Sequence, residues 1–246
     1  MNMHPAVSRS SIQQDHALIT PESHVPLNFP DRVGCTTVYF ITPHMGSAFS
    51  MYSVQFEDNG KYQKNLGEKE VLAYVLTGTG KLELSGSQEI KPGSFFYLPP
   101  GTDLTLAMEN HSRVLFFEKN YDSLTAIHPP QPFVSHESKV TREPFLGDEG
   151  ALLQTLLPNT IEFDMAVNIF EFAPGGTLPM VENHYMEHGL YVLQGSGVYR
   201  LSQSWYPVQE GDAIWMAPFC LQWYVAAGKT PTKYIYYKDM NRDPQF

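Results

Sequence analysis

Short runs of apolar, aromatic and β-branched residues, separated by turn residues, make up most of the chain. Representative runs lie at 73–84 and 190–201, and glycine, proline, asparagine and aspartate separate such runs throughout. No stretch carries the apolar periodicity that an amphipathic helix needs. Strand-forming runs with frequent turn signals are typical of β-barrels and β-sandwiches. The pattern therefore predicts an all-β protein.

The apolar runs occur in two similar sets, which indicates an internal repeat. Three segments of the first half resemble three segments of the second in the same order: 73–84 and 190–201, 90–104 and 208–222, and 114–121 and 234–241. In this alignment Gly78 corresponds to Gly195, and Gly80 corresponds to Gly197. The repeat predicts that the chain contains two copies of one β-structured unit.

The repeat also sets the expected domain boundaries. We expect an N-terminal barrel over residues 36–120 and a C-terminal barrel over residues 150–246. The intervening residues 121–149 are rich in proline and are predicted to form a linker. Residues 1–35 are predicted to form a strap that is partly flexible.

Composition narrows the class of protein. A chain of 246 residues with 42% hydrophobic residues can bury a sizeable core. Its formal net charge of -10 argues against nucleic acid or an anionic membrane as a partner, because both are bound through clustered Lys and Arg. No apolar run approaches the roughly 20 residues that span a bilayer, and the first residues lack the apolar core of a secretion signal. We therefore expect a cytoplasmic protein.

The two cysteines, Cys35 and Cys220, lie far apart in the sequence and form no C-x-x-C motif. This spacing suggests neither a disulfide framework nor a structural zinc site. Both are predicted to be buried thiols.

The strongest chemical signal is the pattern E-x-H-x3-H formed by Glu182, His184 and His188, with Gln222 further along the chain. Two imidazoles, a carboxylate and an amide oxygen suit an octahedral divalent cation such as Mn2+ or Fe2+ better than a closed tetrahedral zinc site. Side chains two residues apart lie on the same face of a strand, so Glu182 and His184 can point together into a barrel. Gln222 would reach the ion from another strand.

A second set of candidate residues lies on the last apolar run. Tyr234, Tyr236 and Lys238 alternate along it, so their side chains should project from the same face of a strand. A lysine inside a barrel is costly to desolvate unless it meets an anion, so Lys238 suggests a substrate carboxylate. Tyr199 is a further candidate for the inward face. An exposed strand-end lysine and simple core packing of the tyrosine rings are the alternatives. A metal ion, a lysine and tyrosine hydroxyls describe a pocket for a small anion, which leaves hydrolase, lyase, isomerase and dioxygenase chemistry open.

The metal-ligand motif lies in a recognisable glycine frame. Residues 176–195 read G-x5-E-x-H-x3-H-x6-G, which resembles the first motif of the cupin family with its ligands permuted. Residues 93–104 read G-x5-P-P-G-x2-L and resemble the second cupin motif, with Leu104 in place of its metal-binding histidine. Because cupins are jelly-roll barrels, the resemblance implies a bicupin, with two tandem barrels.

The repeat predicts that only the C-terminal barrel binds metal. The first-copy residues that align with the four candidate ligands make no credible ligand set: they are Asn65, Gly67, Val71 and Leu104. The N-terminal cupin is therefore predicted to be a scaffold or assembly domain. Edge strands and this metal-free copy suggest a homo-oligomer.

Five segments together resemble the (S)-ureidoglycine aminohydrolase family of purine catabolism: 16–26, 39–52, 182–189, 205–224 and 237–244. The resemblance implies a Mn2+-dependent enzyme that converts (S)-2-ureidoglycine and water into (S)-ureidoglycolate and ammonia in the breakdown of allantoin and allantoate. It also implies an oligomeric assembly.

The resemblance assigns roles to individual residues. Those that match the family's metal ligands are Glu182, His184, His188 and Gln222. Tyr234 and Lys238 match its substrate-contacting residues, and Glu182 and Gln222 also face the substrate. Glu182 is the candidate for proton transfer, and Lys238 for holding the substrate carboxylate. The alternatives are another metal-dependent bicupin enzyme, such as a dioxygenase or isomerase acting on a small carboxylate, a non-catalytic ligand-binding bicupin, or a drifted substrate choice.

Overall fold

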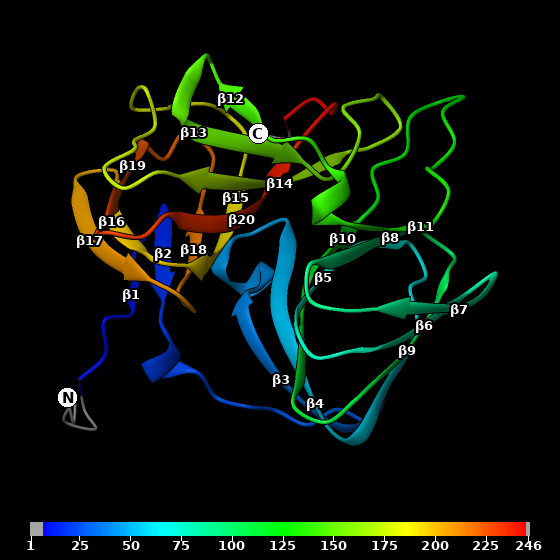
Figure 1. Cartoon of the computed structure of the whole chain (residues 1–246). Coiled ribbons are helices and arrows are strands. Elements are labelled where there is room, and N and C mark those ends of the chain that lie inside the picture. The colour runs from blue at the N-terminus through cyan, green and yellow to red at the C-terminus, as the bar shows by residue number, and fades with distance from the viewer. Residues whose placement is uncertain (1–6, 245–246) are drawn as a thin grey trace. The chain divides into compact units, whose positions relative to one another are not determined.

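The computed structural model describes residues 7–244, which divide into two compact units (Figure 1). The N-terminal unit comprises Val25–Val140 and Thr160–Asp164. The C-terminal unit comprises the described parts of Met1–His24, Thr141–Asn159 and Met165–Phe246. Within residues 7–244 the helices are three single turns of 3-10 type: η1 (Pro21–Ser23), η2 (Pro43–Met45) and η3 (Glu137–Lys139). The predicted all-β bicupin is thus confirmed.

One antiparallel sheet of nine strands forms the N-terminal unit. Its order is β11-β8-β5-β10-β4-β9-β6-β7, with β3 also paired to β4. The strands are β3 (Arg32–Ile41), β4 (Phe49–Asn65), β5 (Lys69–Thr77), β6 (Gly80–Leu84), β7 (Gly86–Ile90), β8 (Ser94–Leu98), β9 (Asp103–Met108), β10 (Ser112–Asn120) and β11 (Phe133–His136). The long strand β4 pairs with β10 and β3 along its first half and with β9 at its end, so the sheet curves around one apolar core.

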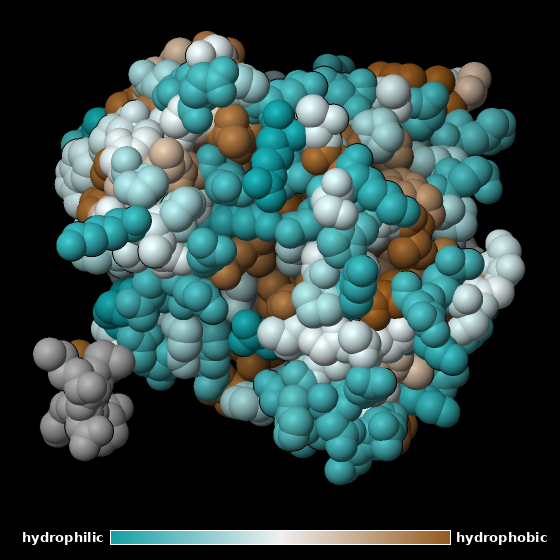
Figure 2. Space-filling view, viewed as in Figure 1, coloured by the Kyte–Doolittle hydropathy of each residue, from teal (hydrophilic) through white to brown (hydrophobic). Residues whose placement is uncertain are grey.

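The C-terminal unit contains an eight-stranded sheet and a three-stranded sheet. Their orders are β1-β2-β18-β15-β20-β14-β13-β12 and β17-β16-β19. The strands are β1 (Ser11–Ile12), β2 (His16–Ile19), β12 (Glu143–Phe145), β13 (Asp148–Thr155), β14 (Met165–Phe172), β15 (His188–Gln194), β16 (Ser196–Leu201), β17 (Ser204–Gln209), β18 (Ala213–Met216), β19 (Gln222–Ala227) and β20 (Thr232–Asp239). Both sheets contribute side chains to a second apolar core. Hydrophilic side chains predominate on the face shown in Figure 2, as expected when two cores take up most apolar side chains.

The segments expected as strap and linker are largely built into the sheets. Strand β2 pairs with β18 of the C-terminal unit, and Figure 1 shows the two side by side. Strand β3 of the N-terminal unit begins at Arg32, inside the expected strap. In the expected linker, β11 belongs to the N-terminal unit, whereas β12 and the start of β13 belong to the C-terminal unit. The flexibility expected at residues 1–6 lies outside the described residues.

The aligned glycines have matching conformations in the two units. Gly78 and Gly195 both adopt a φ of 79°, in the left-handed region that favours glycine. A Cβ at Gly78 would lie 2.7 Å from the Ser112 Cα, and one at Gly195 would lie 3.0 Å from the Thr232 Cα. The repeat read from the sequence therefore reflects a shared backbone requirement.

Two further expectations concern the cysteines and the membrane. Cys35 and Cys220 are both buried free thiols, as predicted. Within residues 7–244, no helix has the length and apolar character needed to cross a bilayer.

Candidate metal and substrate site

The candidate ligands are carried by a loop and by the ends of strands in the C-terminal unit. Glu182 and His184 lie in the loop 173–187 between β14 and β15, not on a regular strand as expected from the sequence. Pro174 and Pro179 lack the N–H group that a continuous strand ladder requires, which accounts for the irregular backbone. His188 is the first residue of β15.

Local backbone contacts nevertheless bring the loop to the end of β19. The Glu182 N–H donates to the Gln222 carbonyl (2.9 Å), and the Gln222 N–H donates to the Glu182 carbonyl (3.0 Å). This isolated bridge places the Glu182 and Gln222 side chains at neighbouring positions. A further bond, from the Phe219 N–H to the His184 carbonyl (2.8 Å), holds His184 beside them.

The four predicted ligand side chains converge. The Nε2 atoms of His184 and His188 lie 3.3 Å apart. The Gln222 amide lies 3.1 Å from the His184 Nε2 and 3.5 Å from the His188 Nε2. The Glu182 Oε2 lies 3.9 Å from the His184 Nε2. Ligand atoms about 2.1 Å from one octahedral ion lie roughly 3 Å apart, so the donor spacing fits a single divalent cation.

The electrostatics of the two imidazoles also favour a cation. Burial lowers the pKa of His188 well below its usual value, and His184 and Lys238 add to this effect. His188 is therefore neutral at physiological pH, which is the form that binds metals. The two facing Nε2 atoms present lone pairs to one point, and a half-turn of the Gln222 amide would add its oxygen. The donor set fits a metal ion of the Mn2+ or Fe2+ type.

A cavity of about 200 Å³ opens beside these ligands. Its walls contain all the predicted substrate-binding residues together with apolar side chains: Phe145, Phe170, Leu178, Glu182, His184, Met186, His188, Leu190, Tyr199, Gln222, Tyr234, Tyr236 and Lys238. The volume is below the roughly 300–1,000 Å³ of clefts for drug-sized ligands. The cavity therefore suits a small metabolite.

Lys238 is the cation of this cavity. Within residues 7–244 its ammonium forms no hydrogen bond or ion pair. Burial lowers the pKa of Lys238, and the nearby Glu182 carboxylate opposes the shift. An ammonium in this position can attract a substrate anion at low desolvation cost, because its own hydration is already reduced.

Tyr199 and Tyr234 are buried in the cavity wall. Burial raises the pKa of both phenols well above the usual value, and nearby acidic groups, including Glu182, add to the effect. Both hydroxyls therefore stay protonated and can donate hydrogen bonds to a bound molecule.

The sequence analysis placed Tyr236 on the same face as Tyr234 and Lys238 without a specific role, and it missed Asn168. The Tyr236 ring lies nearly parallel to the His188 ring, with centroids 5.7 Å apart and planes 16° apart. The Asn168 Nδ2 donates to the Tyr236 hydroxyl over 3.1 Å. Asn168 is a single amide within the apolar run 165–170, and this interruption is the signal that could have identified it. The pair supports the imidazole wall of the site.

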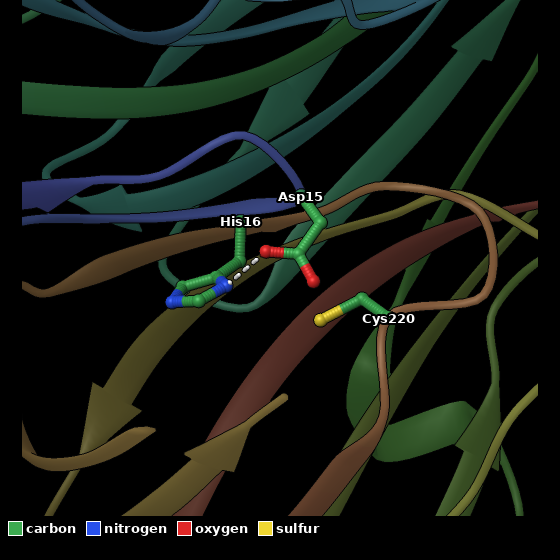
Figure 3. A group of neighbouring side chains, drawn as sticks. All are labelled: Asp15, His16 and Cys220. Carbon is green, nitrogen blue, oxygen red and sulfur yellow. Dashed lines mark hydrogen bonds and ion pairs between the residues drawn. The ribbon is translucent and has the colours of Figure 1, made fainter. Parts of the chain in front are cut away.

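A second cluster of potential ligands lies outside this cavity. Asp15, His16 and Cys220 each place a donor atom within 4.8 Å of the others. Figure 3 shows the Asp15 carboxylate between the His16 ring and the Cys220 thiol. Its oxygens already accept hydrogen bonds from His16 Nδ1 (2.8 Å) and from the Ser202 hydroxyl. The cluster is thus a satisfied hydrogen-bonded network.

A larger groove of about 930 Å³ lies in the N-terminal unit and contains none of the predicted site residues. Four lysines line it, together with Glu89 and Glu109: Lys61, Lys81, Lys91 and Lys139. The chemistry-bearing residues lie instead in the smaller cavity of the C-terminal unit.

The fold defines a bicupin, and its second barrel carries the candidate metal site. The model of the cupin domain matches residues 168–237. A crystal structure of the protein Ylba from Escherichia coli is similar over 97% of both chains, with 30% identity and a TM-score of 0.85.

Curated relatives give the narrower assignment. The chain is 40% identical to the probable (S)-ureidoglycine aminohydrolase of Oryza sativa subsp. japonica, over 98% of this chain and 78% of the relative. It is 39% identical to the (S)-ureidoglycine aminohydrolase of Arabidopsis thaliana, over 98% of this chain and 80% of the relative. The chain belongs to the (S)-ureidoglycine aminohydrolase family, as the sequence resemblance predicted.

Proposed function

We propose that this chain hydrolyses (S)-2-ureidoglycine to (S)-ureidoglycolate and ammonia, with Mn2+ held by Glu182, His184, His188 and Gln222. The observation that carries the proposal is the unpaired ammonium of Lys238 beside the four converging donors, in a chain that belongs to this family. Carboxylate, amide and imidazole donors in this number suit Mn2+.

Lys238 is proposed to bind the substrate carboxylate. The cavity is lined by this ammonium at one position and by apolar side chains such as Phe170 and Leu190 at others. The single ammonium matches a substrate with one anionic group. When bound, the metal supplies positive charge that polarises and orients the substrate. Lys238 then fixes the α-carbon so that its amine and the incoming oxygen lie on defined faces, which accounts for stereospecificity.

Glu182 is proposed to transfer the proton. Its carboxylate is partly buried, at 24% side-chain exposure, and faces the same cavity as Lys238. In the overall reaction water supplies the oxygen that forms the new C–O bond, the C–N bond to the amine breaks, and the departing nitrogen gains a proton. A carboxylate at this position can accept the proton from water and return it to the leaving amine. The protonated phenols of Tyr199 and Tyr234 would donate hydrogen bonds to the polar groups of the substrate.

The test is ammonia release from freshly generated ureidoglycine, measured above the spontaneous rate with and without Mn2+. His184→Ala should reduce the rate to near the spontaneous level. His44→Ala, at an exposed histidine of the N-terminal unit, is the matched control and should leave the rate unchanged. A wild-type rate equal to the spontaneous rate, or full activity in His184→Ala, would exclude the proposal.

A further inference from the structure

The five residues Ala217–Leu221, between β18 and β19, are held from two sides. Phe219 donates its N–H to the His184 carbonyl, on the side of the metal ligands (2.8 Å). Ala217 donates its N–H to the Asp15 carbonyl, on the side of the N-terminal segment (2.9 Å). This connection leads directly into Gln222, the first residue of β19. Contacts that hold the connection in place therefore also position Gln222, a proposed metal ligand.

The Asp15 side chain reaches the same connection by a second route. Its carboxylate accepts a hydrogen bond from the Ser202 hydroxyl in the turn between β16 and β17. The Ser202 N–H in turn donates to the Leu221 carbonyl over 2.7 Å. The Cys220 sulfur lies 3.7 Å from the Ser202 hydroxyl. Asp15 is thereby linked through one residue to the peptide group immediately before Gln222.

His16 keeps the Asp15 carboxylate in place. Its Nδ1 bonds to the Asp15 Oδ1 over 2.8 Å, a contact drawn as a dashed line in Figure 3. Its Nε2 lies 2.9 Å from the Tyr206 hydroxyl. The His16 ring is almost fully buried and meets the Tyr206 ring edge-on. His16 also pairs with Met216 in the ladder between β2 and β18. The orientation of Asp15 is therefore set by buried neighbours.

We propose that Asp15 is a positioning residue for the metal site: it holds Ala217–Leu221 so that the Gln222 amide faces His184 and His188. The inference rests on the proposed metal site. Asp15 is itself 43% exposed, so its removal should cost little global stability and should act through the placement of Gln222. Partners that orient ligands without touching the metal typically contribute about 10- to 100-fold in metal affinity.

The variant Asp15→Ala tests the proposal, with Arg9→Ala as the matched control. Arg9 also ties the N-terminal segment to the rest of the C-terminal unit, through its ion pair with Asp212 (2.7 Å), and it pairs with Glu22 (2.9 Å) within the segment. It contacts neither Ser202 nor the connection to Gln222. Mn2+ binding to the full-length protein is measured by electron paramagnetic resonance of the free ion, and thermal unfolding is followed in parallel.

Asp15→Ala is expected to weaken Mn2+ binding about 10- to 100-fold. Saturating Mn2+ should restore most of its ammonia release. Arg9→Ala should bind Mn2+ like the wild type even if its unfolding temperature falls. Unchanged Mn2+ affinity in Asp15→Ala, or an equal loss in Arg9→Ala, overturns the proposal.

A second variant keeps the test decisive if Asp15→Ala does not fold. Ser202→Ala removes the hydroxyl link and leaves the contact between Asp15 and His16, so it should weaken Mn2+ binding in the same direction by a smaller factor. Binding is read separately from turnover. A wild type that binds Mn2+ but releases no ammonia would therefore refute the proposed function while still testing the role of Asp15.

Discussion

Strand β20 of the C-terminal unit and its counterpart β10 of the N-terminal unit carry opposite charges at one inward position, and this difference separates the candidate site from the predicted scaffold. In the C-terminal unit Lys238 of β20 pairs across the ladder with His188. In the N-terminal unit Glu118 of β10 pairs in the same way with Val71. One barrel thus carries a cation beside an imidazole, and the other carries an anion beside a hydrocarbon side chain.

The two charges also have different surroundings. Glu118 accepts hydrogen bonds from Lys64 (2.7 Å), Lys69 (2.6 Å) and the Tyr52 hydroxyl (2.9 Å). In contrast, the part of the chain that the structure describes provides no such partner for Lys238. A buried charge is tolerated when it is paired and hydrogen-bonded, and an unpaired charge is costly. The comparison indicates that the inward charge of the C-terminal barrel, and not that of the N-terminal barrel, is left without a direct partner among the described residues and so available to an anionic ligand.

The largest expected effect comes from replacing His188 of the C-terminal barrel with valine, the residue at the corresponding position 71 of the N-terminal barrel. His188→Val should abolish Mn2+ binding and reduce kcat/KM for ureidoglycine about a thousandfold or more, because the metal contributes several kcal/mol to the transition state. Metal content after dialysis and ammonia release measure the two effects. The paired control Val71→Ala should leave both unchanged and lower only stability, by about 1–3 kcal/mol. Retained Mn2+ in His188→Val would remove the proposed distinction between the barrels.

The second effect concerns the uncompensated charge itself. Lys238→Met should lower kcat/KM about a hundredfold, since losing one partner of a desolvated charge pair costs roughly 2–5 kcal/mol. Mn2+ affinity should stay close to that of the wild type, because Lys238 is not a proposed ligand. Lys233→Met, on the opposite face of β20, is the control and should have little effect on turnover. A loss that appears in Mn2+ affinity alone would show that Lys238 supports the metal site and does not bind substrate.

A third, smaller effect is expected in the N-terminal barrel, where the charge is compensated. Burial alone would raise the pKa of Glu118, but Lys64 and Lys69 hold it below its usual value. Glu118→Gln should therefore lower the free energy of unfolding by about 1–2 kcal/mol near neutral pH, a modest figure because Lys69 is 42% exposed. Turnover should be unchanged.

The sign of the pH dependence checks this interpretation. A carboxylate with a lowered pKa stabilises the folded state above its unfolded value, and the contribution is lost as pH falls through the folded pKa. The stability gap between wild type and Glu118→Gln should thus narrow below about pH 4.3. Urea unfolding at several pH values measures the gap, and a constant gap contradicts the ion-pair explanation.

A last effect, on stability alone, concerns a pair of carboxyl groups in the same unit. Burial raises the pKa of Glu70 well above its usual value, and Asp164 adds to the shift. A hydrogen bond joins the Glu70 and Asp164 side chains when Glu70 is protonated, while Tyr97 and Lys119 donate to the Glu70 Oε2 and the Asp164 Oδ2. Glu70 is thus protonated at neutral pH, and its stabilising contribution declines as pH rises toward its raised pKa.

Glu70→Gln keeps a neutral donor at this position. Between pH 6 and pH 9 the wild type should lose more stability than the variant, by about 1.4 kcal/mol for each pH unit over which Glu70 stays protonated in the folded state. Urea unfolding at both pH values gives the comparison. If the wild type and the variant respond identically to pH, Glu70 is not the group that titrates.

The repeated fold could be predicted from the sequence because strand-forming runs and the aligned glycines determine backbone conformation over a few neighbouring residues. Gly78 and Gly195 require the same backbone conformation, so their alignment carried structural information. The four proposed ligands were likewise predicted from the close spacing of Glu182, His184 and His188, and the structure brings these side chains and that of Gln222 together. Their role as metal ligands stays a prediction.

Other features depend on contacts that sequence distance hides. The loop geometry of Glu182 arises from a single bridge to Gln222, which no local pattern encodes. The support of Tyr236 by Asn168 joins residues of different strands, and Asp15 meets Ser202 across 187 positions. Such contacts depend on how the whole unit packs. The strand propensities of the individual residues do not predict them.

The pairing of β2 with β18 has a consequence for biosynthesis. Residues 16–19 are synthesised well before their partners at 213–216. Until β18 is made, the edge of β2 that β1 does not cover carries unpaired N–H and C=O groups, which favour association with other chains. The candidate catalytic barrel can therefore complete its folding only after β18 and β20 are made, whereas residues 25–140 of the N-terminal barrel are available earlier. We expect chaperone dependence during expression to be concentrated in this late step.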